Sequence, residues 1–170
     1  MDTDDRDVAI GEVGELLVRG ENVFAGYWML PGPTAEAFRG GWFHTGDLGK
    51  IDEDGYITLV DRKKDMIITG GENVYPVEVE QVIVRHPAVR EVAVFGLPDE
   101  RWGETVVAAV ACDGETTPAE LIAFARERLA HFKCPTRVEV LDELPRNATG
   151  KVLKTTLRST YGSASSAVTR

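Results

Sequence analysis

Residues 66–76 read Met66-Ile-Ile-Thr-Gly-Gly-Glu-Asn-Val-Tyr-Pro76. Two short runs of β-forming residues flank Gly70 and Gly71, and a pair of glycines suits the tight turn of a hairpin. Pro76 stands where a helix can begin, because proline is favoured in the first helical turn. The stretch therefore predicts a β-hairpin that leads directly into a helix.

Strands and helices alternate after this hairpin. The helix that begins at Pro76 carries an apolar face and is expected to end at His86-Pro87. A second helix is predicted from Thr116-Thr-Pro-Ala-Glu120, a typical amino-terminal signature, to about His131. Apolar runs of β-forming residues predict strands at 92–95, 106–110 and 138–141. The order of elements indicates a short sheet flanked by helices.

The part of the chain before the hairpin is β-rich. β-forming residues gather at 15–19, 42–43 and 56–60. Asp52-Glu-Asp-Gly55 predicts a hairpin turn in which Gly55 takes a positive φ. One helical stretch, residues 33–38, interrupts the strands, and we expect Thr34 to cap its start.

The pattern changes at the charged run Asp61-Arg-Lys-Lys-Asp65, which predicts a domain boundary. We expect an α+β fold, with a small β-rich unit over residues 1–63 and a compact domain over residues 64–158. Residues 159–170 are expected to form a flexible tail.

The composition indicates a soluble globular chain of 170 residues, 43% of them hydrophobic. No apolar run reaches the roughly 20 residues that span a bilayer, and the acidic start is unlike a signal peptide, so we expect a cytoplasmic location. The formal charge of −9 argues against a nucleic-acid partner, although residues 144–170 carry only basic charges and could receive a small polyanion. Cys112 and Cys134 have no partner at metal-binding spacing, so neither a metal site nor a disulfide is expected.

Two candidate motifs lie before and at the boundary. In Trp42-Phe-His-Thr-Gly-Asp-Leu48, the carboxylate of Asp47 can accept two hydrogen bonds from a vicinal diol such as a ribose. The alternative is that Asp47 is a turn residue. The run Asp61-Arg-Lys-Lys-Asp65, taken alone, can also be a solvated linker.

Two further motifs lie after the boundary. The bare backbone of Gly70-Gly71 can approach an extended ligand closely, but a plain hairpin turn explains it equally well. In Pro145-Arg-Asn-Ala-Thr-Gly-Lys151, Gly150 frees the loop and Lys151 supplies a compact charge suited to phosphate or carboxylate. The loop is not a phosphate-binding P-loop, because Pro145 and Val152 stand where that loop needs a glycine and a hydroxyl residue.

Together and in this order, the four motifs resemble the later signature motifs of the adenylate-forming superfamily. Its members include acyl-CoA synthetases, luciferases and the adenylation domains of peptide synthetases. The resemblance covers residues 14–158, and Gly70-Gly-Glu-Asn-Val-Tyr-Pro76 and Gly96-Leu-Pro-Asp-Glu-Arg-Trp-Gly103 are most similar to acyl- or aryl-CoA synthetases. It implies that residues 1–63 end a large amino-terminal body domain and that residues 64–158 form the mobile carboxy-terminal domain.

The resemblance also implies roles for single residues. Lys151 matches the catalytic lysine that bridges the acid and the α-phosphate of ATP. Asp47 matches the aspartate on the ribose hydroxyls, and Arg62 a further nucleotide contact. Lys64 occupies the position of the hinge about which the carboxy-terminal domain rotates between the two steps of the reaction.

For CoA, the resemblance implies contacts in the glycine-rich hairpin, at Gly70, Gly71 and Glu72. Trp102 and Lys133 are further candidates, although Trp102 could equally close the edge of the core. Cys134 stands beside Lys133 where some relatives carry a basic residue.

The expected substrates are a small carboxylic acid, ATP and CoA, with Mg²⁺ as cofactor. The phosphate loop, the magnesium-associated glutamate and the acyl pocket of the family lie upstream of the matched part. We therefore expect the chain to need an amino-terminal domain as its partner and to be inactive alone. The alternatives are an adenylation module that serves a carrier protein and a binding fragment without catalysis. The sequence does not predict which acid is used.

Overall fold

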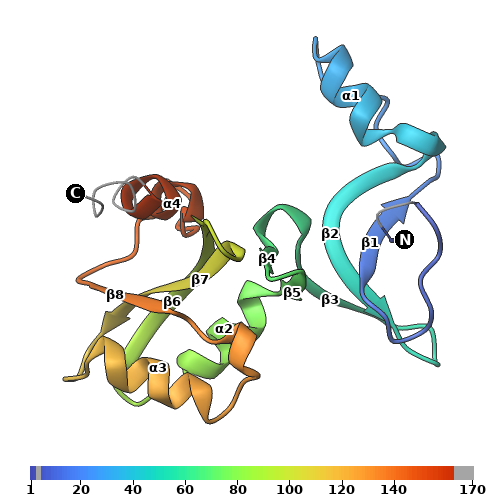
Figure 1. Cartoon of the computed structure of the whole chain (residues 1–170). Coiled ribbons are helices and arrows are strands. Elements are labelled where there is room, and N and C mark those ends of the chain that lie inside the picture. The colour runs from blue at the N-terminus through green and yellow to red at the C-terminus, as the bar shows by residue number, and fades with distance from the viewer. Residues whose placement is uncertain (3–4, 163–170) are drawn as a thin grey trace. The chain divides into compact units, whose positions relative to one another are not determined.

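The structure is a computed structural model and describes residues 1–2 and 5–162. The chain divides into two compact units, Met1–Lys64 (unit 1) and Asp65–Arg170 (unit 2). Both are drawn in Figure 1. The division lies one residue after the predicted boundary at 63/64.

Unit 1 is built on an antiparallel sheet in the order β1-β2-β3. The strands are β1 (Gly14–Val18), β2 (Phe43–Ile51) and β3 (Ile57–Arg62). The predicted turn between β2 and β3 is confirmed, because Gly55 has φ +85° and the Asp52 carboxylate accepts the N–H groups of Asp54 and Tyr56. Farther from the turn, a register shift between Leu48 and Gly49 places Asp47 opposite Arg62.

The helix of unit 1, α1 (Pro31–Ala37), is followed by a 3₁₀ turn, η1 (Arg39–Gly41). The prediction that Thr34 caps α1 is wrong, since the cap position is Leu30. Thr34 lies inside the helix, where its hydroxyl donates to the Leu30 carbonyl at 2.7 Å. Pro31 suits the first helical position and moves the start forward.

Unit 2 contains a sheet in the order β5-β4-β7-β6, with β8 paired to β7. Its strands are β4 (Ile67–Thr69), β5 (Glu72–Val74), β6 (Val89–Asp99), β7 (Gly103–Cys112) and β8 (Arg137–Leu141). The predicted hairpin is confirmed as β4 and β5. The pairing of β7 with β8 is parallel, whereas the other pairs are antiparallel.

The helices of unit 2 are α2 (Pro76–Ile83), α3 (Pro118–Arg126) and α4 (Lys154–Gly162), with a 3₁₀ turn, η3 (His131–Lys133). The predicted start of α3 is confirmed by a reciprocal capping box between Thr117 and Glu120. Its predicted end near His131 is wrong, because the helix ends at Arg126 and the backbone is extended at Ala130. Residues 159–162, expected in the tail, belong to α4, and the rest of that tail lies outside the described residues.

The core of unit 2 lies on both faces of β6 and β7, and Figure 1 shows α2 and α3 on one face and α4 on the other. Alternate residues of a strand point to opposite faces. Val94, Ala108 and Val110 therefore join the cluster under α2 and α3. Phe95, Val107 and Ala109 join the cluster under α4, together with the buried Leu157. Because both faces are covered, these strands read as continuous apolar runs.

Across the described part of the chain, no helix combines the length and the apolar character that crossing a bilayer requires.

Candidate functional site

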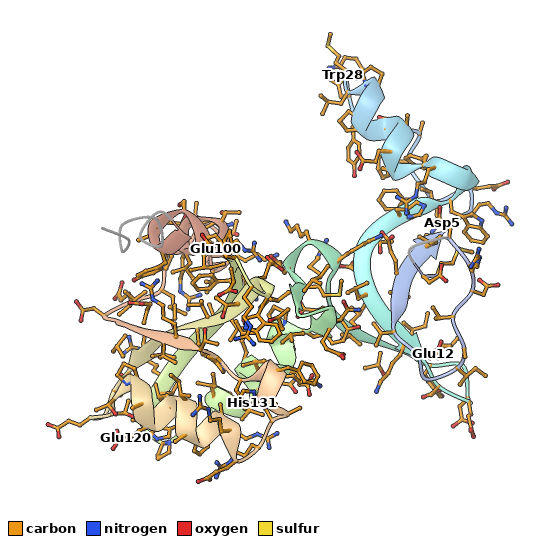
Figure 2. The ribbon with its side chains drawn as sticks, in the orientation of Figure 1. Asp5, Glu12, Trp28, Glu100, Glu120 and His131 are labelled. Carbon is orange, nitrogen blue, oxygen red and sulfur yellow. The ribbon has the colours of Figure 1, made fainter. Side chains whose placement is uncertain are left out.

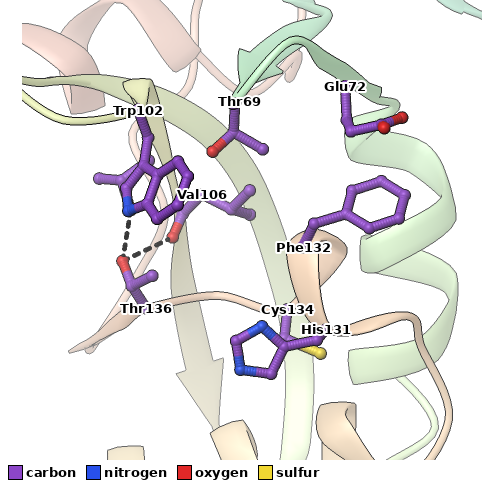
Figure 3. Close-up of a pocket in the computed structure, with 10 residues that line it drawn as sticks. Thr69, Glu72, Trp102, Val106, His131, Phe132, Cys134 and Thr136 are labelled. Carbon is purple, nitrogen blue, oxygen red and sulfur yellow. Dashed lines mark hydrogen bonds between the residues drawn. The ribbon is translucent and has the colours of Figure 1, made fainter.

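Unit 2 holds a pocket of about 280 Å³ beside the glycine-rich turn (Figure 3). The β4–β5 hairpin contributes Thr69, Gly70 and Glu72 to its wall. Trp102 and Phe132 lie on opposite sides, with Val106 between them. Two aromatic rings facing one opening can hold a flat or apolar group between them.

The backbone of Gly70 carries the wall formed by Trp102. Gly70 has φ +59°, and its N–H donates to the Trp102 carbonyl at 2.8 Å. A Cβ at this position would lie 3.1 Å from the indole ring, so the close packing and the positive φ both favour glycine. Asp99 fixes the other side, since one carboxylate oxygen accepts the N–H groups of Arg101 and Trp102 at 2.9 Å.

Hydroxyl groups and a thiol line the inner wall. The Thr105 and Thr136 hydroxyls lie 2.6 Å apart, and the Thr136 hydroxyl also donates to the Val106 carbonyl. Cys134 is buried, and this burial raises the pKa of its thiol. The thiol is therefore protonated near neutral pH and is a poor nucleophile.

The predicted CoA residues are brought together only in part. Gly70, Glu72 and Trp102 line the pocket, whereas Gly71 and Lys133 do not. The Lys133 ammonium is held by both oxygens of Glu78, at 2.7 and 2.8 Å. His131 also lines the pocket.

The loop before α4 fixes the backbone of Lys151. The Asn147 carboxamide oxygen accepts the N–H groups of Thr149 and Lys151 at 3.0 and 2.9 Å, an arrangement typical of an asparagine turn. Arg146 donates to the Gly150 carbonyl at 2.6 Å and pairs with Glu91 at 2.6 Å. The loop geometry is therefore set by side chains that the motif alone does not identify.

The side chain of Lys151, unlike its backbone, is not held by other residues of the described chain. It is exposed, and its ammonium has no hydrogen bond or ion pair with any of residues 1–2 and 5–162. Lys151 does not line the pocket described above. The loop thus presents an unpaired cation on a positioned backbone.

The two predicted nucleotide contacts lie side by side in unit 1. Asp47 and Arg62 are register neighbours on β2 and β3, and Arg62 Nε lies 2.7 Å from Asp47 Oδ1. Both side chains are partly exposed, at 31% for Asp47 and 50% for Arg62. A partly exposed carboxylate can still accept hydrogen bonds from the hydroxyl groups of a ligand.

A buried carboxylate next to Asp47 was not foreseen. The side chain of Glu15 is 5% exposed and accepts hydrogen bonds from Lys63 at 2.8 Å and from the Gly46 N–H at 3.1 Å, with His44 Nδ1 also 3.1 Å away. Burial opposes the charge of Glu15, but the bonds from Lys63 and His44 outweigh it and hold its pKa below the ordinary value. Nothing in the run Glu15-Leu-Leu-Val18 distinguishes this glutamate from a solvated one.

Lys64, the predicted hinge residue, is exposed and ends unit 1. It is the middle residue of a 3₁₀ turn, η2 (Lys63–Asp65).

Within the described residues, no group of three or more histidine, cysteine, aspartate or glutamate side chains could hold a metal ion.

A family model and several relatives of known name are similar to this chain. Residues 78–151 match the model of the AMP-binding enzyme C-terminal domain. The chain is 50% identical over 157 residues to 2-succinylbenzoate–CoA ligase of Geobacillus kaustophilus, covering 91% of this chain and 32% of that protein. It is 51% identical over 154 residues to feruloyl-CoA synthase of an Amycolatopsis species, covering 89% of this chain and 31% of the relative.

Solved structures show the same similarity. ATP-bound MatB from Rhodopseudomonas palustris superposes with a TM-score of 0.87 at 46% identity, over 92% of this chain and 32% of that one. The chain thus spans about a third of the length of the relatives it matches.

Proposed function

Because residues 78–151 belong to the AMP-binding enzyme C-terminal domain family, we propose that the chain is the carboxy-terminal part of an ATP-dependent acid:CoA ligase. The observation that carries this proposal is the unpaired ammonium of Lys151 on a loop fixed by Asn147 and Arg146. The names of the relatives support it, since both are ligases or synthases that form CoA esters.

In the first step, a carboxylate oxygen of the acid bonds to the α-phosphorus of ATP. The bond from that phosphorus to the bridging oxygen breaks, and pyrophosphate leaves with the electron pair. Two anions must approach each other, and charge shifts to the leaving group. The Lys151 ammonium lowers the energy of this arrangement by placing a compact positive charge between the carboxylate and the α-phosphate.

The nucleotide is held in part by unit 1 in this proposal. The Asp47 carboxylate accepts hydrogen bonds from the ribose hydroxyls. Arg62, which contacts Asp47 at 2.7 Å, fixes the orientation of that carboxylate and supplies a positive charge for the nucleotide. The adjacency of the two side chains is what supports assigning both to one ligand.

In the second step, the CoA thiol gives its proton to solvent and its sulfur attacks the acyl carbon. A C–S bond forms, the bond from the acyl carbon to the phosphate oxygen breaks, and AMP leaves with the electron pair of that bond. We assign the pocket at Gly70, Glu72 and Trp102 to CoA, with Gly71 on the exposed turn beside it. Lys133 can reach a CoA phosphate only after it releases Glu78, so its role depends on a rearranged side chain. Lys64 is the hinge that exchanges the lysine loop for this pocket.

No cluster of three or more histidine, cysteine, aspartate or glutamate side chains among the described residues could hold a metal ion by itself. We assign Mg²⁺ and the acyl pocket to the remainder of such an enzyme. The use of ATP and CoA supports a cytoplasmic location.

The test joins this chain to the amino-terminal body of the Geobacillus kaustophilus ligase and measures pyrophosphate release with ATP and 2-succinylbenzoate. Lys151→Ala is expected to slow release by about 10²-fold or more, because it removes a charge used in the transition state. Lys50→Ala is the matched control, since Lys50 is also exposed, and it should leave the rate unchanged. A loss of only a few-fold with Lys151→Ala would refute the role of this lysine.

The same chimera decides between acceptors. The chimera is supplied with either CoA or a holo carrier protein. We expect it to form the thioester with CoA, at a rate that saturates as the CoA concentration rises. Transfer to the carrier protein alone would instead support the adenylation module.

A further inference from the structure

The loop that carries Lys151 is exposed along its whole length. Residues 146–151 contribute no buried side chain, whereas Leu144 before the loop and Leu157 after it are buried. Apolar packing therefore contributes little to holding these six residues in place. Their position depends on polar contacts.

The peptide bond between Gly150 and Lys151 is held at both of its polar groups. Its carbonyl oxygen, on Gly150, accepts a hydrogen bond from Arg146 Nη1 at 2.6 Å. Its N–H, on Lys151, donates to the Asn147 carboxamide oxygen at 2.9 Å. The carbonyl of Lys151 in turn accepts the Asn147 N–H at 3.0 Å. Because peptide bonds are planar, holding the units on both sides of the Lys151 Cα sets the direction in which its side chain leaves the backbone.

The other branch of the Arg146 guanidinium connects the loop to the sheet. Arg146 Nη2 lies 2.6 Å from Glu91 Oε1. Glu91 belongs to β6 and is paired with Ala111 of β7. The planar guanidinium thus joins the Gly150 carbonyl to a carboxylate of the sheet in one rigid fork, which the single ammonium of a lysine cannot reproduce.

Helix α4 attaches the other end of the loop to the same strand. Lys154, the first residue of α4, lies 2.8 Å from Glu80 Oε1 on α2, and the same oxygen accepts the Val94 N–H of β6 at 2.8 Å. The side chains of this second pair are 18% and 21% exposed, against 41% and 33% for Arg146 and Glu91. Exposed ion pairs contribute little to stability. The Arg146–Glu91 pair is therefore the attachment that can be removed with the smaller effect on folding.

We propose that Arg146 and Glu91 are positioning residues for Lys151. Arg146 holds the peptide bond that precedes the lysine, and Glu91 holds Arg146 against β6. Both terminal nitrogens of the guanidinium are occupied by protein acceptors, so the arginine acts through the backbone of Lys151. The role rests on the proposed function, in which the Lys151 ammonium meets the carboxylate and the α-phosphate. A displacement of about 1 Å in such a group can slow a reaction by about 10²-fold.

The alternative is that Arg146 serves the nucleotide directly as a positive charge. The two roles differ in the part that Glu91 plays. If Glu91 holds a positioning arginine, its removal misplaces the loop and slows the reaction. If Arg146 binds the nucleotide itself, removal of Glu91 frees the guanidinium and does not slow the reaction. Glu91→Ala therefore distinguishes positioning from direct binding.

Backbone ¹⁵N relaxation on the 170-residue chain tests the positioning without catalysis. The wild type should show an order parameter near about 0.85 at Lys151, and Arg146→Ala should lower it below about 0.6. Glu91→Ala should lower it by a smaller amount, because the bond from Arg146 to the Gly150 carbonyl can still form. A Lys151 order parameter that is already below about 0.6 in the wild type, or that neither variant changes, would overturn the proposal.

Arg90 provides the matched control in the same unit. Its guanidinium also joins a carboxylate, on Asp113, to a backbone carbonyl, on Asp142, and its side chain is 40% exposed. Arg90→Ala should change neither the order parameter of Lys151 nor the reaction rate. Because it removes the same kind of contact elsewhere, it separates lost positioning from general destabilisation.

The chimera with the Geobacillus kaustophilus body measures the effect on the first step. Arg146→Ala should lower kcat for pyrophosphate release by about 10-fold or more and leave KM for ATP near the wild-type value. Glu91→Ala should lower kcat several-fold. Glu91→Gln keeps an oxygen that can accept from Arg146 and should retain most of the rate. A raised KM for ATP in Arg146→Ala, together with a wild-type rate in Glu91→Ala, would show direct binding and refute the positioning role.

Failure of the positioning role differs from failure of the proposed function. If Lys151→Ala leaves pyrophosphate release intact, the proposed function fails, and the positioning role fails with it. If Lys151→Ala abolishes release but neither Arg146→Ala nor Glu91→Ala slows it, only the positioning role fails.

Discussion

Unit 1 and unit 2 differ in the interactions that stabilise each of them internally. In unit 2, apolar side chains fill both faces of the sheet, with Phe95, Ile67 and Val107 fully buried. In the described part of unit 1, Leu48 is the one buried hydrophobic residue, and the most buried charge is Glu15. Hydrophobic burial is the dominant stabilising term in folding, whereas ion pairs contribute little net stability. Unit 2 therefore carries its own core, and unit 1 does not.

The surface of unit 1 shows the same contrast. Trp28 is 89% exposed and Met29 82% exposed, and Figure 2 shows Trp28 projecting near α1. Side chains of this size are normally covered in a stable domain. The comparison teaches that unit 1 depends on further apolar burial for full stability, and the following experiments can break or sharpen that conclusion.

The largest expected effect is a difference in local stability between the units. Amides of β6 and β7 should exchange only through global unfolding, at about 5–15 kcal/mol. Amides of β1, β2 and β3 should open at less than half of that free energy. Native-state hydrogen exchange measures both in one sample. Equal protection in the two sheets would show that unit 1 has a stabilising element that its burial does not reveal.

The next effect is removal of the largest fully buried side chain. Phe95→Ala should destabilise unit 2 by about 3–5 kcal/mol, because it leaves a cavity between β6 and α4. Urea unfolding can be followed through Trp102 after Trp28 and Trp42 are replaced by phenylalanine. Val84→Ala, at an exposed position, is the control and should change little. A small effect of Phe95→Ala would mean that the core of unit 2 collapses easily around the gap.

A smaller effect concerns pH and unit 1. The pKa of Glu15 is below its ordinary value in the folded state, so its contribution is present above about pH 4.3 and is lost as the pH falls through the folded pKa. Acid should therefore destabilise unit 1, and Glu15→Gln should weaken this pH dependence. Fluorescence of Trp42, with the other tryptophans replaced, reports the transition.

Glu120 provides the matched control for this experiment. Its pKa is also lowered, by hydrogen bonds from the backbone and side chain of Thr117, but it lies in unit 2 and is exposed. Glu120→Gln should leave the acid transition of unit 1 unchanged. An unchanged transition in Glu15→Gln would show that other carboxylates control the acid stability of unit 1.

The smallest effect is local to α3. Thr117→Ala removes the hydroxyl that accepts the Glu120 N–H at 3.2 Å and should cost about 1 kcal/mol. Thr116→Ala, which loses only a 3.3 Å contact with Glu120, should cost less. Thermal unfolding monitored by circular dichroism compares the two. Equal losses of stability in the two variants would show that the Thr117 hydroxyl is not the main cap of α3.

Features set by neighbouring residues were predictable from the sequence. The β4–β5 hairpin, the apolar strands and the capping box of α3 depend on patterns a few residues long. The end of α3 at Arg126 was not predictable, because the apolar pattern continues to Leu129, which packs against the core although it lies beyond the helix. Tertiary packing overrides the helical pattern at that point.

The candidate site follows the same rule. The motif residues stand out through their resemblance to a family, but their partners lie far away in sequence. Lys133 meets Glu78 across 55 positions and Lys63 meets Glu15 across 48. No local pattern encodes such pairs. The ion pairs of Lys133 with Glu78 and of Lys63 with Glu15 are therefore visible only in the folded structure.

The parallel pairing of β8 with β7 has a consequence for the time course of folding. The β6–β7 hairpin closes through the short connection between Asp99 and Gly103, whereas β8 reaches β7 only after the crossover through α3. Local contacts form faster than distant ones, because closing a longer loop loses more chain entropy. The strand that precedes the lysine loop is thus expected to join the sheet late. Lys151 would reach its working position only when the rest of unit 2 has already formed.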